Sequence, residues 1–159
     1  MKKWIPLLFF AVAAARAQSL DTVLAAIETP EKVYRITETE TKPEPANGMF
    51  TLTRFISTNF KIPAISNKKL TVFVSFIVEK DGSLSDLHFV HYLAEALYED
   101  KFANGNDPSD AAYEAAQLNL IEPEAVRVLT LFPDIWKPAT IKDVPVRCFY
   151  NLPIVFNIE

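Results

Sequence analysis

Apolar residues recur at every second position through the last part of the chain. From position 144 to position 158 every even-numbered residue is apolar, whereas the odd-numbered positions mix polar residues, prolines and two hydrophobic residues. This alternation is typical of a β-strand with one face on a hydrophobic core and the other largely toward solvent. It predicts a strand over Val144–Ile158. Its apolar face would consist of Val144, Val146, Cys148, Tyr150, Leu152, Ile154, Phe156 and Ile158.

A second alternating segment lies in the middle of the chain. Apolar residues occupy alternate positions from Leu70 to Val78, and the dipeptide Asp81-Gly82 follows shortly after. This dipeptide suits the positive backbone angles of a tight hairpin turn. Residues 84–92 then return as the partner strand. We therefore expect an antiparallel hairpin here.

Helical spacing of apolar residues appears on the N-terminal side of this hairpin. Met49, Leu52, Ile56 and Phe60 share one face of a predicted helix that Pro63 ends. Three further elements are expected before it. They are a short amphipathic helix over Leu20–Ile27, a short strand over Val33–Ile36 and a polar, extended connector over Thr37–Gly48.

Residues 93–121 interrupt the strand pattern. We expect there a helix over Leu93–Phe102, a turn over 104–108 and an alanine-rich helix over Ala111–Leu120, capped by Ser109 or Asp110. A last helix should begin at Pro123 and close at Pro133, and Trp136 should pack under the sheet. This order of elements predicts an α+β fold, an antiparallel sheet with helices packed on one face.

The N-terminus has the features of an export signal. Lys2 and Lys3 precede an apolar stretch from Trp4 to Ala15, and Ala15-Arg16-Ala17 is a small-x-small cleavage site. Twelve apolar residues in a helix reach about 18 Å, which is short of a bilayer core of about 30 Å. We expect cleavage after Ala17 and a periplasmic protein without a membrane span in its mature form. An uncleaved anchor is the alternative.

This reading divides the chain into three parts. Residues 1–17 are the signal peptide, residues 18–48 an N-terminal segment, and residues 49–159 one domain with an insertion at 93–121. Cleavage would remove three basic residues and no acidic one, so the formal net charge would fall from −4 to −7. That negative charge disfavours nucleic acid and anionic membrane surfaces as partners.

No pattern in the sequence indicates catalysis or a cofactor. Cys148 is the single cysteine and lies on the apolar face of the last strand, where a small hydrophobic residue is expected. His88, His91 and Glu95 suggest a metal site, but positions three apart on a regular strand face opposite ways. No serine lies in a Gly-x-Ser-x-Gly context. We expect no catalytic residues, no metal, no cofactor and no enzymatic activity.

Five segments together resemble a known family. They are Lys-Pro-Glu-Pro-Ala-Asn-Gly-Met at 42–49, Asn-Phe-Lys-Ile-Pro-Ala-Ile at 59–65, the hairpin at 72–86, Glu-Ala-Val-Arg-Val at 124–128, and Trp-Lys-Pro at 136–138 with the strand at 145–156. Their order is that of the C-terminal domains of TonB-type energy transducers. The chain is similar to these domains over most of residues 42–159, apart from the insertion and without the family's transmembrane anchor.

The resemblance implies a binding function. Domains of this family recognise a short extended peptide of an outer-membrane receptor by strand addition beside their last strand. Strand addition needs an edge with free amide and carbonyl groups. Since Pro153 has no N–H, the odd-numbered backbone groups of the last strand should face such an edge. The predicted peptide-binding edge therefore consists of Arg147, Phe149, Asn151 and Pro153, with a neighbouring strand or a second copy as alternative occupants.

Two classes of function follow, and a third has less support. The first is a periplasmic binding module that captures an extended segment of an outer-membrane receptor or other envelope protein, linked through the family to TonB-dependent transport. The second is a self-associating structural envelope protein without a transport role, a homodimer paired through the same edge. The third is an enzyme with its site in the insertion, for which the sequence offers no paired catalytic residues.

Overall fold

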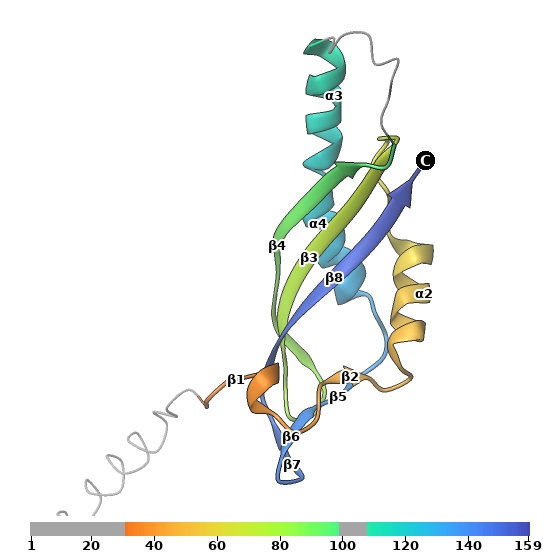
Figure 1. Ribbon diagram of the computed structural model, residues 1–159. Helices are drawn as coiled ribbons and strands as arrows, with labels where there is room; N and C mark the ends of the chain where they lie inside the picture. Colours follow the sequence, from red (N-terminus) through yellow and green to blue (C-terminus); the bar gives the residue numbers. More distant parts are fainter. Residues whose placement is uncertain (1–30, 99–107) are drawn as a thin grey trace, which may run out of the picture. The chain divides into compact units, whose positions relative to one another are not determined.

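The computed structural model describes residues 31–98 and 108–159. Most of them belong to one compact unit that begins at Val33. The predicted signal peptide, the helix over 20–27, the second part of the helix over 93–102 and most of the turn over 104–108 lie outside the described residues. Figure 1 shows the elements in their order: β1 (Tyr34–Arg35), η1 (Ile36–Glu38), β2 (Glu44–Pro45), α2 (Met49–Asn59), β3 (Lys68–Val78), β4 (Leu84–Ala96), α3 (Pro108–Leu118), α4 (Ile121–Thr130), β5 (Trp136–Lys137), β6 (Ala139–Ile141), β7 (Val144–Val146) and β8 (Cys148–Ile158).

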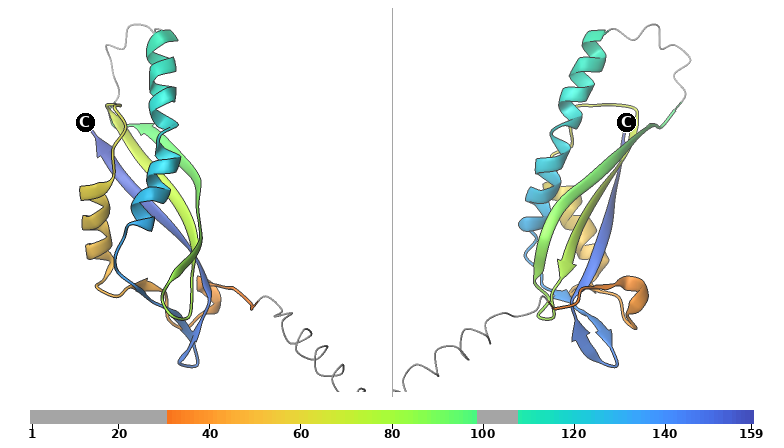
Figure 2. Two further views of the ribbon diagram at one scale, coloured as in Figure 1. Left: turned by 180° about the vertical axis from the view of Figure 1, so that it is seen from behind. Right: turned by 90° about the vertical axis from the view of Figure 1, so that its left-hand side faces the viewer.

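The main sheet has the strand order β1-β8-β3-β4. The central strand β3 pairs antiparallel with β4 on one side and with β8 on the other, whereas β1 is parallel to β8. Helices α2 and α4 pack against the same face of this sheet (Figure 2). The predicted α+β fold with an antiparallel sheet and helices on one face is therefore confirmed.

The core lies between the sheet and these two helices. The alternate residues of β3 that face the helices have no solvent exposure. Leu52 and Ile56 of α2 and four residues of α4 cover them, and Trp136 packs edge-on against Phe76 and Tyr150 with ring centroids 5.2 and 5.4 Å apart. The predicted core position of Trp136 is thus confirmed. The buried β3 residues are Leu70, Val72, Val74, Phe76 and Val78.

The predicted hairpin forms, but its turn differs from the expected one. The loop has three residues, because the Glu79 N–H donates to the Ser83 carbonyl (2.9 Å) and the Gly82 N–H donates to the Glu79 carbonyl (3.0 Å). Of the dipeptide Asp81-Gly82, Gly82 alone has a positive φ, +84°. This geometry is a three-residue loop that ends in a left-handed glycine. Asp81 stabilises the loop by accepting a hydrogen bond from the Ser83 N–H (2.9 Å).

Strand β4 continues four residues beyond the predicted end of the hairpin. The expected helix from Leu93 is wrong over residues 93–96, because these residues pair with Lys68–Thr71 of β3. The segment predicted as an insertion at 93–121 therefore contributes at both of its ends to the domain, since Ile121 is also buried in the core. Between these ends, α3 begins at Pro108, so Ser109 and Asp110 lie in its first turn and are not its caps.

Three other predicted boundaries need correction. Helix α4 begins at Ile121 and not at Pro123, which is tolerated because the first turn of a helix needs no backbone N–H partners. The connector over 37–48 contains β2, which pairs with β5 at Glu44↔Lys137 and Pro45↔Trp136. The strand predicted over 144–158 divides at Arg147, since β7 pairs with β6 whereas β8 pairs with β3. Val144 is consequently 59% exposed and not in the core.

No helix in the described part of the chain is long and apolar enough to cross a membrane.

Candidate peptide-binding edge and groove

The main sheet has two long strands next to its edges, β4 on one side and β8 on the other, where the two-residue strand β1 covers only part of β8. The two strands differ in regularity. The pairing of β4 with β3 contains register shifts between Phe73 and Val74 and between Ser75 and Ile77. Such bulges interrupt an edge and hinder the addition of another strand. The pairing of β8 with β3 runs without a shift from Cys148 to Ile158. The β8 edge is therefore the better template for a further strand.

Strand β1 covers the first residues of this edge. It pairs Tyr34 with Cys148 and Arg35 with Phe149, and the Tyr34 N–H donates to the Arg147 carbonyl at 2.9 Å. Because backbone groups alternate between the two sides of a strand, this bond implies that the odd-numbered groups of β8 point away from β3. Beyond Phe149, no strand among residues 31–98 and 108–159 pairs with this side of β8.

The uncovered part of the β8 edge spans residues 151–157. Asn151, Val155 and Asn157 direct their N–H groups outward, and Pro153 interrupts this series because proline has no N–H. The side chains of these four residues are exposed. We call this segment the free edge. It offers a short ladder of outward amide and carbonyl groups to an extended chain.

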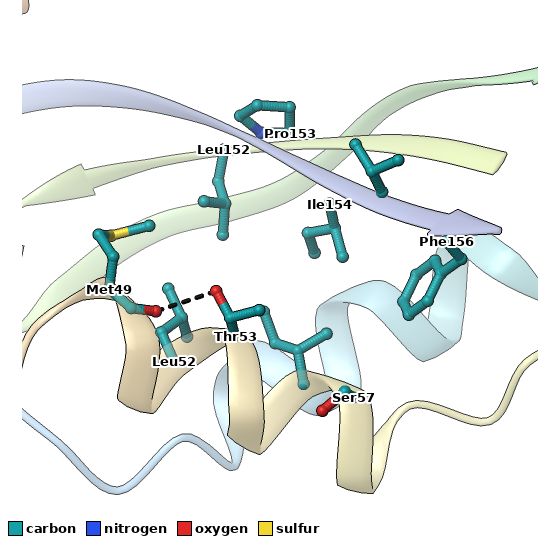
Figure 3. Close-up of a pocket in the computed structure, with 10 residues that line it drawn as sticks. Met49, Leu52, Thr53, Ser57, Leu152, Pro153, Ile154 and Phe156 are labelled. Carbon is teal, nitrogen blue, oxygen red and sulfur yellow. Dashed lines mark hydrogen bonds between the residues drawn. The ribbon is translucent and has the colours of Figure 1, made fainter. Parts of the chain in front are cut away.

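An apolar groove of about 280 Å³ lies beside the free edge, between β8 and α2. Figure 3 shows that Met49, Thr53 and Ser57 of α2 form one side and that Leu152, Ile154 and Phe156 of β8 lie opposite. Met49 lies at the Leu152 end and Ser57 at the Phe156 end (Figure 3). Pro153 and Val155 complete the strand side of the lining. The groove thus follows the same residues of β8 whose backbone forms the free edge.

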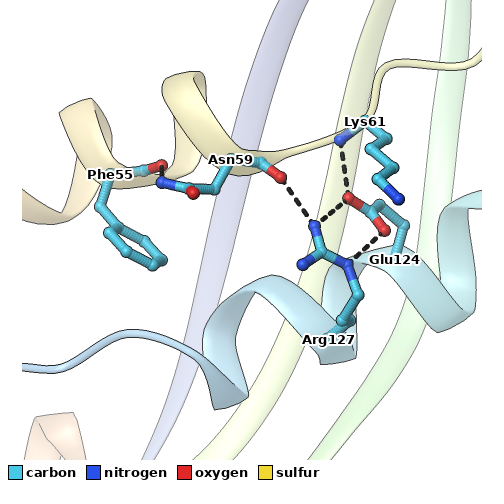
Figure 4. Close-up of polar contacts among 5 residues, drawn as sticks. All are labelled: Phe55, Asn59, Lys61, Glu124 and Arg127. Carbon is cyan, nitrogen blue, oxygen red and sulfur yellow. Dashed lines mark hydrogen bonds and ion pairs between the residues drawn. The ribbon is translucent and has the colours of Figure 1, made fainter.

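A polar cluster fixes the C-terminal end of α2 against α4 (Figure 4). The Glu124 carboxylate accepts hydrogen bonds from Arg127 (2.5 and 2.7 Å) and from the Lys61 N–H (2.7 Å), while Arg127 also donates to the Asn59 carbonyl (2.7 Å). The hydrogen bonds from Arg127 hold the pKa of Glu124 below its usual value. The rings of Phe60 and Phe156, 4.6 Å apart, join the same end of the helix to β8. Phe156 also lines the groove, so its contact with Phe60 lies at the end of the groove nearest Ser57.

Two of the four predicted edge residues lie on the free edge, and the other two lie where β1 covers β8. Asn151 and Pro153 lie on the free edge. Arg147 and Phe149 lie where β1 pairs, although the Phe149 side chain is 41% exposed. The Arg147 side chain is half-buried and forms a two-point ion pair with Glu79 (2.7 and 2.8 Å). That contact joins the start of β8 to the end of β3.

This ion pair predicts a pH-dependent contribution to stability. The hydrogen bonds from Arg147 lower the pKa of Glu79, so the native state favours the ionised carboxylate. A lowered native pKa stabilises the fold above the unfolded pKa, and this stabilisation is lost as the pH falls through the native value. Glu79→Gln should reduce the free energy of unfolding by about 1 kcal/mol at neutral pH. The deficit should shrink below about pH 4.3, the ordinary pKa of glutamate.

Urea unfolding of wild type and Glu79→Gln across this pH range measures the effect. If the difference in unfolding free energy between the two proteins stayed constant from neutral to acidic pH, the ion pair between Glu79 and Arg147 would not stabilise the fold.

The two histidines lie on the same face of the sheet, contrary to the argument from regular spacing. The register shift near Val90 pairs His91 with Phe73 and His88 with Ser75, which are two positions apart on β3. His91 stacks on the Phe73 ring at 4.4 Å, and His88 Nε2 bonds the Ser75 hydroxyl at 2.8 Å. No group of three metal-binding side chains occurs within the described ranges.

Cys148 occupies the environment expected of a small hydrophobic residue. Its side chain is fully buried, and this burial raises the pKa of its thiol. A raised pKa lowers the fraction of reactive thiolate. We expect Cys148 to pack in the core without chemical reactivity.

The part of the site that α2 contributes was not predicted from the sequence. Met49 was predicted to share the apolar face of this helix with Leu52 and Ile56, but it is 38% exposed and lines the groove. Met49, Thr53 and Ser57 follow one another at four-residue spacing beside the buried pair Leu52 and Ile56. That spacing can be read from the sequence. The sequence does not show that α2 lies beside β8, and only this arrangement turns the three residues into one side of a groove.

Comparisons with protein-family models, curated proteins and solved structures return no match for this chain. The resemblance to TonB-type C-terminal domains therefore rests on the five sequence segments alone.

Proposed function

We propose that this chain is an exported binding module, similar to TonB C-terminal domains, that captures an extended segment of another envelope protein. The segment would add to the sheet as a strand beside residues 151–157 of β8. The observation that carries this proposal is the regular, uncovered edge next to an apolar groove. The edge offers backbone hydrogen bonds and the groove offers contacts to side chains, which are the two requirements of recognition by strand addition.

A periplasmic location and an outer-membrane receptor as partner belong to the same proposal. The location rests on the signal-like N-terminus, with Lys2, Lys3 and the cleavage site after Ala17. The receptor rests on the family resemblance, as does a link to TonB-dependent transport. Neither idea requires an enzymatic site, and the proposal includes none.

Site-specific photo-crosslinking in cells tests the proposal. A photoreactive amino acid at Asn157, on the free edge, should cross-link to one envelope protein through an extended segment of that protein. The matched position is Glu95, which is exposed on β4, the interrupted edge. Asn151→Pro in the same chain should strongly reduce the cross-link from position 157. Equal cross-linking from both positions would contradict strand addition at β8.

Self-association through the same edge is the second candidate function. A regular antiparallel edge can pair with its own copy, because a two-fold axis brings identical strands together. The experiment above then yields cross-links between copies of this chain. Sedimentation at increasing concentration distinguishes the two functions, since a stable dimer that excludes peptide would favour self-association.

A further inference from the structure

The side of the groove formed by α2 is a straight row of three residues. Met49, Thr53 and Ser57 are four positions apart and face β8 (Figure 3). Four residues of an α-helix advance about 6 Å along its axis. Two residues of a β-strand advance about 6.6 Å. A strand running along the groove would therefore place each of its groove-side residues opposite about one member of this row.

The direction of side chains in such a strand follows from β8. Leu152, Ile154 and Phe156 point from β8 toward the helices, and the strand beside β8 would direct every second side chain to the same side. Those side chains would enter the groove. The strand β1 already pairs with the earlier part of the same edge, so the groove continues an interface that the chain itself uses for strand pairing.

The lining of the groove favours aliphatic side chains. None of its lining residues is charged. The hydroxyl groups of Thr53 and Ser57 donate to backbone carbonyls of their own helix, at 2.9 Å each, so these donors are already used. A charged or strongly polar side chain would lose hydration there without gaining a partner.

We infer that the groove selects the captured segment by its side chains and accepts aliphatic residues at alternate positions of that segment. Thr53 is the residue that limits the depth of the groove at the middle of the row. This inference rests on the proposed function and adds the chemical class of the ligand. Thr53 suits this role because it lies between Met49 and Ser57 in the row and opposite Ile154. A larger side chain at position 53 would fill the groove and leave the backbone groups of β8 unchanged.

Two short peptides of equal charge test the inference. The first has valine at alternate positions, with lysine or threonine between; in the second, serine replaces each valine. Binding is followed by the backbone amide resonances of Asn151, Val155 and Asn157 in the full chain. We expect the valine peptide to shift these resonances and to bind at least about tenfold more tightly than the serine peptide, since each buried aliphatic side chain contributes roughly one factor of ten.

A matched pair of variants locates the selectivity. Thr53→Trp should weaken binding of the valine peptide about tenfold or more and leave the serine peptide unaffected. Thr58→Trp is the control, because Thr58 is also exposed on α2, bonds the carbonyl four residues earlier at 2.9 Å, and does not line the groove. Equal binding of both peptides, or equal effects of the two variants, would overturn the inference and leave strand addition standing. If neither peptide shifted the resonances of the free edge, both this inference and the proposed strand addition would be overturned.

Discussion

Gly82→Ala should destabilise the domain by about 3 kcal/mol, the largest effect on stability that we expect from a single methyl group. Gly82 ends the β3–β4 loop with a φ of +84°, which costs an L-residue about 1–2 kcal/mol. A Cβ atom at this position would lie 2.0 Å from the backbone oxygen of Trp136. Overpacking of this kind typically costs a further 1–3 kcal/mol.

The clash cannot be relieved by a rotamer change, because the neighbour is backbone. The Trp136 N–H also donates to the Gly82 carbonyl at 2.9 Å, so a shift of either segment breaks this bond. Trp136 packs on Phe76 and Tyr150 in the core. Displacing Trp136 would therefore disturb the end of the core beneath the hairpin loop.

Urea unfolding of two further variants separates the clash from backbone strain. Gly82→Asn retains the clash but relieves much of the strain, since asparagine tolerates positive φ, so it should be nearly as destabilising as Gly82→Ala. Gly48→Ala introduces strain without a clash, because Gly48 has a φ of +83° and nothing within 4 Å of an added Cβ. A stability close to wild type for Gly82→Asn would show that strain, and not the contact with Trp136, makes glycine necessary.

The sequence was sufficient to predict an element wherever a single periodicity of apolar residues extends through that element. The alternation in β3 predicted a strand buried on one face, and the helical spacing of Leu52 and Ile56 predicted α2. These signals are local, because side-chain direction depends only on the backbone conformation of the same segment. They were also sufficient for the fold class, since sheet and helices must bury their apolar faces against each other.

Errors arose where a distant partner decided the structure. Leu93-Ala94-Glu95-Ala96 consists of good helix formers, but pairing with β3 holds these residues in an extended conformation. The period of two continues through Arg147, although the hydrogen-bond partner changes there from β6 to β3. Side-chain periodicity carries no information about that change. The bulge near Val90 likewise cannot be recognised from periodicity. It places His88 and His91 on the same face of the sheet, whereas regular spacing predicts opposite faces.

Part of the candidate site was predictable because it depends on a local property of the chain, whereas the rest depends on distant partners. The absence of an N–H at Pro153 indicated which side of β8 is the outer edge, and the bond from Tyr34 to the Arg147 carbonyl agrees with that parity. The sequence did not indicate that β1 pairs at Cys148 and Phe149, which shortens the edge to residues 151–157. The groove requires α2 to lie beside β8, and that arrangement depends on contacts such as Phe60 with Phe156.

Asn151→Pro should reduce binding of an added strand at least about tenfold while the domain remains folded. Asn151 provides the first outward N–H of the free edge beyond β1. Proline removes this donor, which costs on the order of 1 kcal/mol, and its ring also hinders the approach of the partner strand. With Pro153 two positions later, the free edge would retain the outward N–H groups of Val155 and Asn157 alone.

The alternating direction of the backbone N–H groups along β8 provides two control variants. Asn151→Ala removes the side chain but keeps the N–H, so it should bind nearly as well as wild type. Leu152→Pro removes an N–H that faces β3 and should destabilise the fold by about 3 kcal/mol or more, because Leu152 is buried and paired with Val74. Titration of the alternating valine peptide against Asn151→Pro and Asn151→Ala, after thermal unfolding has confirmed their folding, measures the difference. If the folded Asn151→Pro variant bound this peptide as tightly as Asn151→Ala does, the captured segment would not be paired with the β8 edge.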